Sequence, residues 1–126
     1  MRMMVDLACM SNGQRITIGE IACRQDVPGP FMAKIALQAA AAGLVCTQRG
    51  TGGGLALARH PDRITLLQVV EAIDGPIAFM RCTLEPSRCP RFNKCAVHPI
   101  WEKAKQQLEE LLSNTSLSEV TQAQKA

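Results

Sequence analysis

A glycine-rich stretch between two short strand-like segments is the feature that most restricts how this chain can fold. Residues 44–49 (LVCTQR) include the β-branched Val45 and Thr47, and larger and smaller apolar side chains alternate in residues 55–58 (LALA), as they do in β-strands. Between them lies GTGGG at 50–54, and glycine permits the positive φ angles that a tight turn needs. The pattern therefore predicts a β-hairpin.

A phosphate-binding loop is the competing interpretation of GTGGG. Such loops lead from a strand into a helix, and the nucleotide-binding version ends in GK followed by Ser or Thr. The sequence continues instead with a strand-like alternation and has no GK pair at this place. These two differences argue against nucleotide binding.

Helical patterns precede and follow the hairpin. We predict helices at about residues 1–11, 18–24, 30–42, 66–73 and 98–113. Thr17 with Glu20, and Thr65 with Gln68, have the spacing of capping boxes, in which each side chain satisfies a free backbone N–H of the first helical turn. Because residue 1 already lies in an apolar helical pattern, we expect the chain to lack the first turn or two of its first helix.

The helix at 30–42 follows a turn, QDVPGP at 25–30, and carries a predicted apolar stripe of Phe31, Ile35 and Ala39. Helix, short capped helix, turn and helix is the order of a helix-turn-helix. A glycine-tipped hairpin directly after it is a wing. We therefore predict a mainly α fold with a small β-hairpin, a winged helix-turn-helix domain followed by a long C-terminal dimerisation helix.

The last third of the chain contains the strongest amphipathic pattern. Apolar residues of the 98–113 helix recur at spacings of 3, 4 and 7, at Trp101, Ala104, Leu108, Leu111 and Leu112. This stripe suggests a second copy as partner, and packing against the chain's own domain is the alternative. From Thr115 onward we expect a short helical turn and then a disordered polar tail. The predicted divisions are a DNA-binding domain at 1–76, a cysteine-rich loop at 77–97, a dimerisation helix at 98–113 and a tail at 114–126.

The 30–42 helix is the candidate DNA reader, although its exposed polar side chains are few. Lys34 can pair with guanine or phosphate and Gln38 with adenine. Two arginines bracket the wing, within reach of phosphates or a narrow minor groove. The full set of candidate DNA contacts is Pro28, Lys34, Gln38, Arg49, Thr51 and Arg59.

The segment from Cys82 to Trp101 concentrates metal-binding residue types. Cys82, Cys89, Cys95 and His98 have the spacing C-x6-C-x5-C-x2-H. Thiolates and imidazole hold zinc and iron–sulfur clusters, and this spacing does not separate the two. The other cysteines, Cys9, Cys23 and Cys46, lie in helix or strand patterns, and we expect them to be small buried apolar residues. His60 is expected to be a surface residue.

Composition limits the class of protein. The 126 residues are 47% hydrophobic, enough for one folded domain, and the net charge of +3 is compatible with nucleic acid without requiring it. No transmembrane span or signal peptide is evident, which predicts a cytoplasmic protein. Clustered cysteines in that compartment favour metal or redox chemistry over structural disulfides. No nucleophile–base pair or paired carboxylates are recognisable, so we do not expect an enzyme.

The chain resembles the Rrf2 family of bacterial winged-helix transcription regulators, and in particular its iron–sulfur-binding, IscR-like and NsrR-like subset. The resemblance is strongest in residues 41–59 (AAGLVCTQRGTGGGLALAR), 64–76 (ITLLQVVEAIDGP) and the three cysteines with HPIW at 98–101. It implies a homodimer that crosses its long C-terminal helices, and a cluster rather than zinc at the cysteines. Six residues separate Cys82 from Cys89, compared with five in several members.

These observations together predict a homodimeric regulator whose binding to double-stranded operator DNA is modulated by an iron–sulfur cluster that senses iron, nitric oxide or redox state. We favour a 2Fe–2S cluster, with 4Fe–4S as the alternative, and Cys82, Cys89, Cys95 and His98 as its ligands. Two other functions remain open. One is a cluster-free thiol switch, in which these cysteines form a disulfide under oxidation. The other is a zinc-stabilised interaction module.

Overall fold

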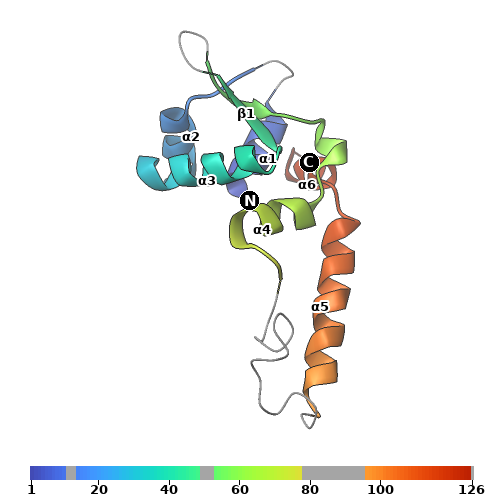
Figure 1. Ribbon diagram of the computed structural model, residues 1–126. Helices are drawn as coiled ribbons and strands as arrows, with labels where there is room; N and C mark the ends of the chain where they lie inside the picture. The colour runs from blue at the N-terminus through green and yellow to red at the C-terminus, as the bar shows by residue number, and fades with distance from the viewer. Residues whose placement is uncertain (11–13, 49–52, 78–95, 126) are drawn as a thin grey trace.

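The computed structural model describes residues 1–10, 14–48, 53–77 and 96–125. In chain order its elements are α1 (Arg2–Cys9), α2 (Ile18–Gln25), α3 (Gly29–Ala41), β1 (Val45–Gln48), β2 (Gly54–Leu57), the 3₁₀ helix η1 (Pro61–Arg63), α4 (Leu66–Asp74), α5 (His98–Ser113) and α6 (Leu117–Lys125). Figure 1 shows α1 to α4, the sheet and α6 gathered in one body, from which α5 extends. The prediction of a mainly α fold with one small β-hairpin is confirmed. Within these ranges no helix has both the length and the apolar character needed to cross a membrane.

Local hydrogen bonds fix the turn between α2 and α3. The Thr17 hydroxyl accepts a hydrogen bond from the backbone N–H of Glu20 at 3.1 Å and so caps the start of α2. The helix ends at Asp26, whose φ of 54° lies in the left-handed region. The N–H of Val27 then donates to the carbonyl of Ala22 at 2.9 Å. These bonds set the direction in which α3 leaves α2.

The sheet is tied to the helix-turn-helix unit by a short bridge. β1 and β2 pair antiparallel with Val45 opposite Leu57. Ile16, just before α2, exchanges two backbone hydrogen bonds with Leu55, at 3.1 and 2.6 Å. Gly54 allows this close approach, because its φ is +134° and a Cβ there would lie 2.5 Å from the Ile16 carbonyl oxygen.

One apolar cluster joins the elements of the body. Its largest members are less than 2% exposed: Met4, Ile16, Ile21, Leu44, Leu55, Ile64, Val69 and Leu117. They come from α1, α2, β2, α4, α6 and the segments between them. α5 contributes no buried residue to this core, so this helix, the longest in the described part of the chain, is held to the body mainly through α4.

The buried face of α3 differs from the predicted stripe. Met32, Ala36 and Ala39 are buried, whereas Phe31 is 55% exposed and Ile35 is half-buried. The prediction is therefore wrong for Phe31. Both sets of residues have helical spacing, and the position of the packed neighbours α2, α4 and β1 decides which set faces inward.

Two later helices have the predicted limits to within one residue. α4 starts with the predicted capping box: the N–H of Gln68 donates to the Thr65 hydroxyl at 3.1 Å, and the Thr65 N–H donates to the Gln68 side-chain oxygen at 2.9 Å. α5 covers residues 98–113, as its apolar periodicity indicates. Local sequence signals are sufficient for both helices.

The chain end differs from the disordered tail expected after Thr115. α6 is a nine-residue helix that packs against α1 and η1. Leu117 is fully buried, and its N–H donates to the carbonyl of Ile64 at 2.8 Å. The Ser116 hydroxyl accepts from the Glu119 N–H at 3.2 Å, which caps the helix. A few apolar residues are enough for docking because the body supplies the rest of the apolar surface.

Candidate nucleic-acid interface and cysteine segment

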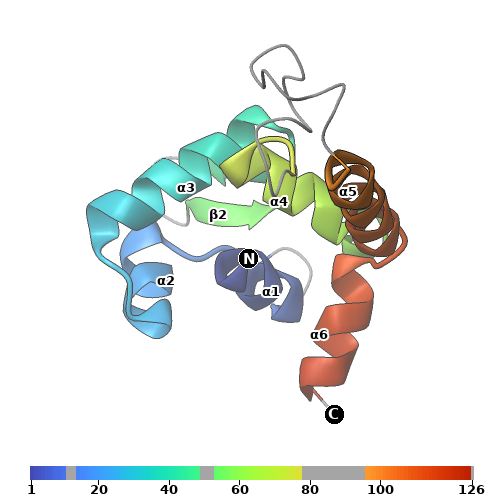
Figure 2. The same cartoon turned by 90° about the horizontal axis from the view of Figure 1, so that it is seen from below.

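α3 lies at the periphery of the molecule, on the opposite side of the sheet from α1 (Figure 2). Lys34 is exposed and Gln38 is half-buried, one helical turn apart on the outward side of this helix. Pro28 is exposed and directly precedes the first residue of α3. The structure therefore places these three candidate DNA contacts along one helix that can be approached from outside.

The remaining DNA candidates belong to the wing. Arg59 lies two residues after β2, at the base of the hairpin, and its Nε donates to the carbonyl of Gly43 at 3.4 Å. Because Gly43 lies two residues after the last residue of α3, Arg59 lies near the C-terminal end of the helix that carries Lys34. Arg49 and Thr51 lie outside the described residues.

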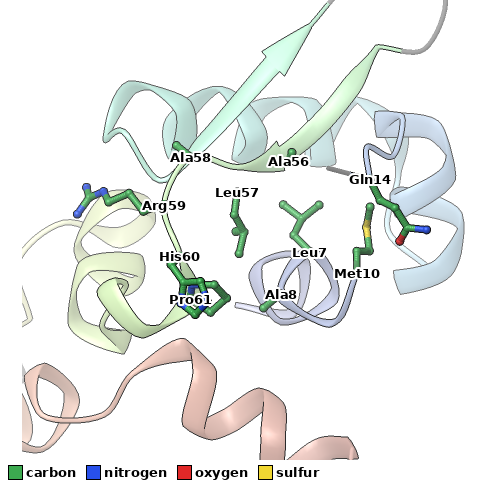
Figure 3. Close-up of a pocket in the computed structure, with 10 residues that line it drawn as sticks. All are labelled: Leu7, Ala8, Met10, Gln14, Ala56, Leu57, Ala58, Arg59, His60 and Pro61. Carbon is green, nitrogen blue, oxygen red and sulfur yellow. The ribbon is translucent and has the colours of Figure 1, made fainter. Parts of the chain in front are cut away.

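A cavity of about 310 Å³ lies between the end of α1 and β2 (Figure 3). Leu7 and Leu57 face each other across it, and His60 and Pro61 close one side. The guanidinium of Arg59 extends away from the cavity, toward the side on which it reaches Gly43. The cavity is thus lined by both polar and apolar groups, and Arg59 is the one candidate DNA contact among its lining residues.

Only one of the four predicted metal ligands is described. Cys82, Cys89 and Cys95 lie outside the described residues, and His98 is the first residue of α5. The His98 side chain is half-buried and its Nδ1 atom is shielded from solvent. Among the residues that the structure covers, no group of three or more His, Cys, Asp or Glu could hold a metal ion.

The other three cysteines are free thiols in different environments. Cys9 is half-buried, as a small apolar residue of α1 would be, whereas Cys23 and Cys46 are exposed. The expectation of burial is therefore wrong for Cys23 and Cys46. Cys46 lies in β1, where it, Thr47 and Gln48 are all exposed, and the Arg15 Nη1 lies 4.0 Å from its sulfur.

Sequence reasoning missed two features of the helices α1 to α3. The carboxylate of Asp6 in α1 accepts hydrogen bonds from Arg24 at 2.8 Å and Gln25 at 3.0 Å in α2. No local pattern predicts such a contact between residues 18 and 19 positions apart. Leu37 is 72% exposed on the outward side of α3; helical periodicity alone, which groups it with Lys34, could have found it.

Comparison with known proteins gives a consistent result over nearly the whole chain. Residues 1–123 match the model of the Rrf2 family, described as iron-dependent transcriptional regulators. An HTH-type transcriptional regulator from Aquifex aeolicus (strain VF5) is 30% identical over 113 residues, which cover 88% of this chain and 78% of the relative. The regulator IscR of Xenorhabdus nematophila is 27% identical over 121 residues, which cover 96% of this chain and 73% of IscR.

Solved structures show the same fold. IscR of T. potens superposes with a TM-score of 0.77 at 26% identity, covering 97% of this chain and 80% of IscR. CymR of B. subtilis, described as a global cysteine regulator, also has a TM-score of 0.77, at 22% identity, with coverage of 97% and 89%. At that identity the second likeness shows the fold alone.

Proposed function

The chain belongs to the Rrf2 family of transcriptional regulators, and from this premise we propose that it binds operator DNA as a homodimer whose affinity is modulated by an iron–sulfur cluster. The observation that carries the DNA part is the position of α3 at the edge of a winged-helix body, with Lys34 and Leu37 exposed on its outward side. Regulation of transcription, rather than catalysis, is the activity of this family. We place the protein in the cytoplasm, where operator DNA is found.

The exposed apolar side chains of α5 support a dimer. Ile100 and Leu111 are 63% and 62% exposed, and Val97, directly before α5, is 50% exposed. Among the described elements, α5 packs mainly against α4 (Figure 1). A helix that extends from its own domain with apolar residues in solvent is stabilised by a second helix of the same kind. Two copies joined through α5 would present two α3 helices to two operator half-sites.

The chemistry of the donor set supports a cluster. Three thiols and one imidazole lie within 17 positions, and the described member, His98, is in the first turn of α5 with Nδ1 shielded from solvent. We assign Cys82, Cys89, Cys95 and His98 as ligands, with a 2Fe–2S cluster favoured over 4Fe–4S. A bound cluster would link these four residues to one another. Oxidants, nitric oxide or iron depletion can destroy such a cluster and so remove the link.

The order of the elements along the chain explains how a cluster in this segment would affect DNA binding. The ligand segment joins the end of α4 to the start of α5, so restraining it restrains the angle between the two helices. At its other end α5 is continuous with residues 115–117, which exchange backbone hydrogen bonds with the start of α4: Leu66 N–H donates to Thr115 at 3.0 Å. The orientation of α5 relative to the body would set the spacing of the two α3 helices in a dimer.

Anaerobic purification with iron, sulfide and zinc assays tests the cofactor. We expect a coloured protein with matched iron and sulfide, and a colourless protein when Cys82, Cys89 and Cys95 are all replaced by Ala. The matched control replaces the exposed Cys23 and Cys46, which should leave iron content unchanged. One zinc per chain would instead support the zinc-stabilised module, and a metal-free protein the thiol switch.

Fluorescence anisotropy on operator-containing duplexes tests the regulatory part. Phosphate contacts make DNA affinity fall steeply with salt, so we expect a linear decrease of log affinity with log salt for the loaded protein. Triple replacement of the cysteines should remove the response of DNA affinity to oxidants. An unchanged affinity and an unchanged oxidant response in that variant would refute cluster control while leaving DNA binding in place.

A further inference from the structure

The outward side of α3 carries few hydrogen-bonding groups. Pro30, Lys34, Leu37 and Ala41 are exposed and succeed one another at spacings of 4, 3 and 4, so they form one line along the helix, here named the reading stripe. The opposite side of the helix is buried in the core. Within the stripe only Lys34 has a side-chain donor, and Leu37, at 72%, is the most exposed of the large apolar residues that the structure describes.

This composition limits how the helix can distinguish base pairs. In the major groove, guanine, adenine and cytosine are recognised by hydrogen bonds, whereas thymine also presents an apolar C5-methyl group. Lys34, with the half-buried Gln38 beside it, can make one or two polar contacts with bases. The rest of the stripe offers only hydrocarbon, and hydrocarbon distinguishes bases by contact with thymine methyl groups.

We propose that Leu37 is a specificity-determining residue that reads the C5-methyl group of a thymine in each operator half-site; this inference rests on the proposed function. Ala41 ends at its Cβ and the Pro30 ring is bound to its own backbone, so Leu37 is the stripe's one apolar side chain long enough to extend into the groove. Lys34 lies one turn away on the same face and positions the helix through a guanine or phosphate.

The expected effect follows from the size of one methyl group. Burying a group of this size changes affinity about 4-fold, the equivalent of about 0.8 kcal/mol. A homodimer on a symmetric site makes the contact twice, so removing the methyl group from both half-sites should weaken binding about 15-fold. An effect of this size is readily measured at constant salt.

The experiment uses the full chain and a duplex that it selects from a random-sequence DNA library. In the selected duplex each symmetric pair of thymines is replaced in turn by deoxyuridine, which removes only the methyl group. Dissociation constants are measured by fluorescence anisotropy for the wild type, Leu37→Ala and Leu37→Gln. Lys34→Ala serves as the matched control on the same stripe.

For the wild type we expect one thymine pair whose replacement weakens binding about 15-fold. Both Leu37 variants should bind the original duplex more weakly and lose the response to deoxyuridine at that pair. Removing the side chain and removing the methyl group form a double-mutant cycle, in which the two losses are not additive if the two groups are in contact. Lys34→Ala should weaken binding to every duplex and retain the deoxyuridine response. Because Leu37 is exposed, its variants should melt at the wild-type temperature.

Two results would overturn the inference without touching the proposed function. One is a wild type that binds its selected duplex with no response to deoxyuridine at any position. The other is a deoxyuridine response that persists undiminished in both Leu37 variants, which would leave Leu37 for contact with another protein. A chain that selects no sequence and binds DNA at no salt concentration would overturn the proposed function together with the inference.

Discussion

Replacing Leu117 by Ala tests whether α6 belongs to the folded core. Leu117 is fully buried at the start of α6, against a body to which the helix is also tied by the hydrogen bond to Ile64. The substitution removes three carbon atoms, worth about 0.8 kcal/mol each in transfer free energy, and leaves a cavity that adds to the loss. We therefore expect the free energy of unfolding to fall by about 3 kcal/mol and the melting temperature by about 10 °C.

Urea denaturation followed by circular dichroism measures this loss. The midpoint should move to lower urea with the slope unchanged, and protein concentration is held constant because a dimer's stability depends on it. Leu37→Ala is the matched control, since the same atoms are removed from a side chain that is 72% exposed. A loss below about 0.5 kcal/mol for Leu117→Ala, equal to that of the control, would refute the packing of α6 as described.

Three further substitutions probe single contacts by the same measurement. Asp6→Ala should cost about 1–2 kcal/mol, because its mostly buried carboxylate loses the charge-assisted bond to Arg24 at 2.8 Å; equal stability would mean that the pair contributes nothing. Thr65→Ala should cost about 1 kcal/mol through loss of the α4 cap, and Thr65→Ser should restore most of it. Gly54→Ala should cost more than about 2 kcal/mol, because its φ is +134° and the new Cβ would meet the Ile16 carbonyl. Gly29→Ala, whose Cβ would meet nothing within 4 Å, should be tolerated, and a similar loss at both glycines would contradict the steric argument.

Much of the fold was predictable because its signals are local. The capping residues Thr17 and Thr65 each bond the backbone three positions later, as their spacing indicates. The alternation on both sides of GTGGG predicts β1 and β2, and apolar periodicity gives α5 its limits. Each of these features depends on residues close together in the chain, so sequence reasoning can evaluate them.

Burial was less predictable, because it depends on contacts between distant segments. Phe31 has the spacing of a core residue yet lies in solvent, and Cys23 and Cys46 are exposed although cysteine is usually buried. In the opposite direction, α6 docks on α1 at the other end of the chain. Periodicity identifies an apolar face of a helix without identifying the surface that covers it.

The candidate site divides in the same way. The sequence by itself determined the candidate residues: the predicted donor set Cys82, Cys89, Cys95 and His98, and the basic residues Lys34, Arg49 and Arg59 of α3 and the wing. The tertiary structure decided which side of α3 faces outward, and so left Leu37 and Lys34 exposed. It also placed the Arg59 side chain against the carbonyl of Gly43, near the end of α3. The physical reason is that residue type and spacing are encoded locally, whereas exposure is set by the packing of α2, α4 and the sheet around α3.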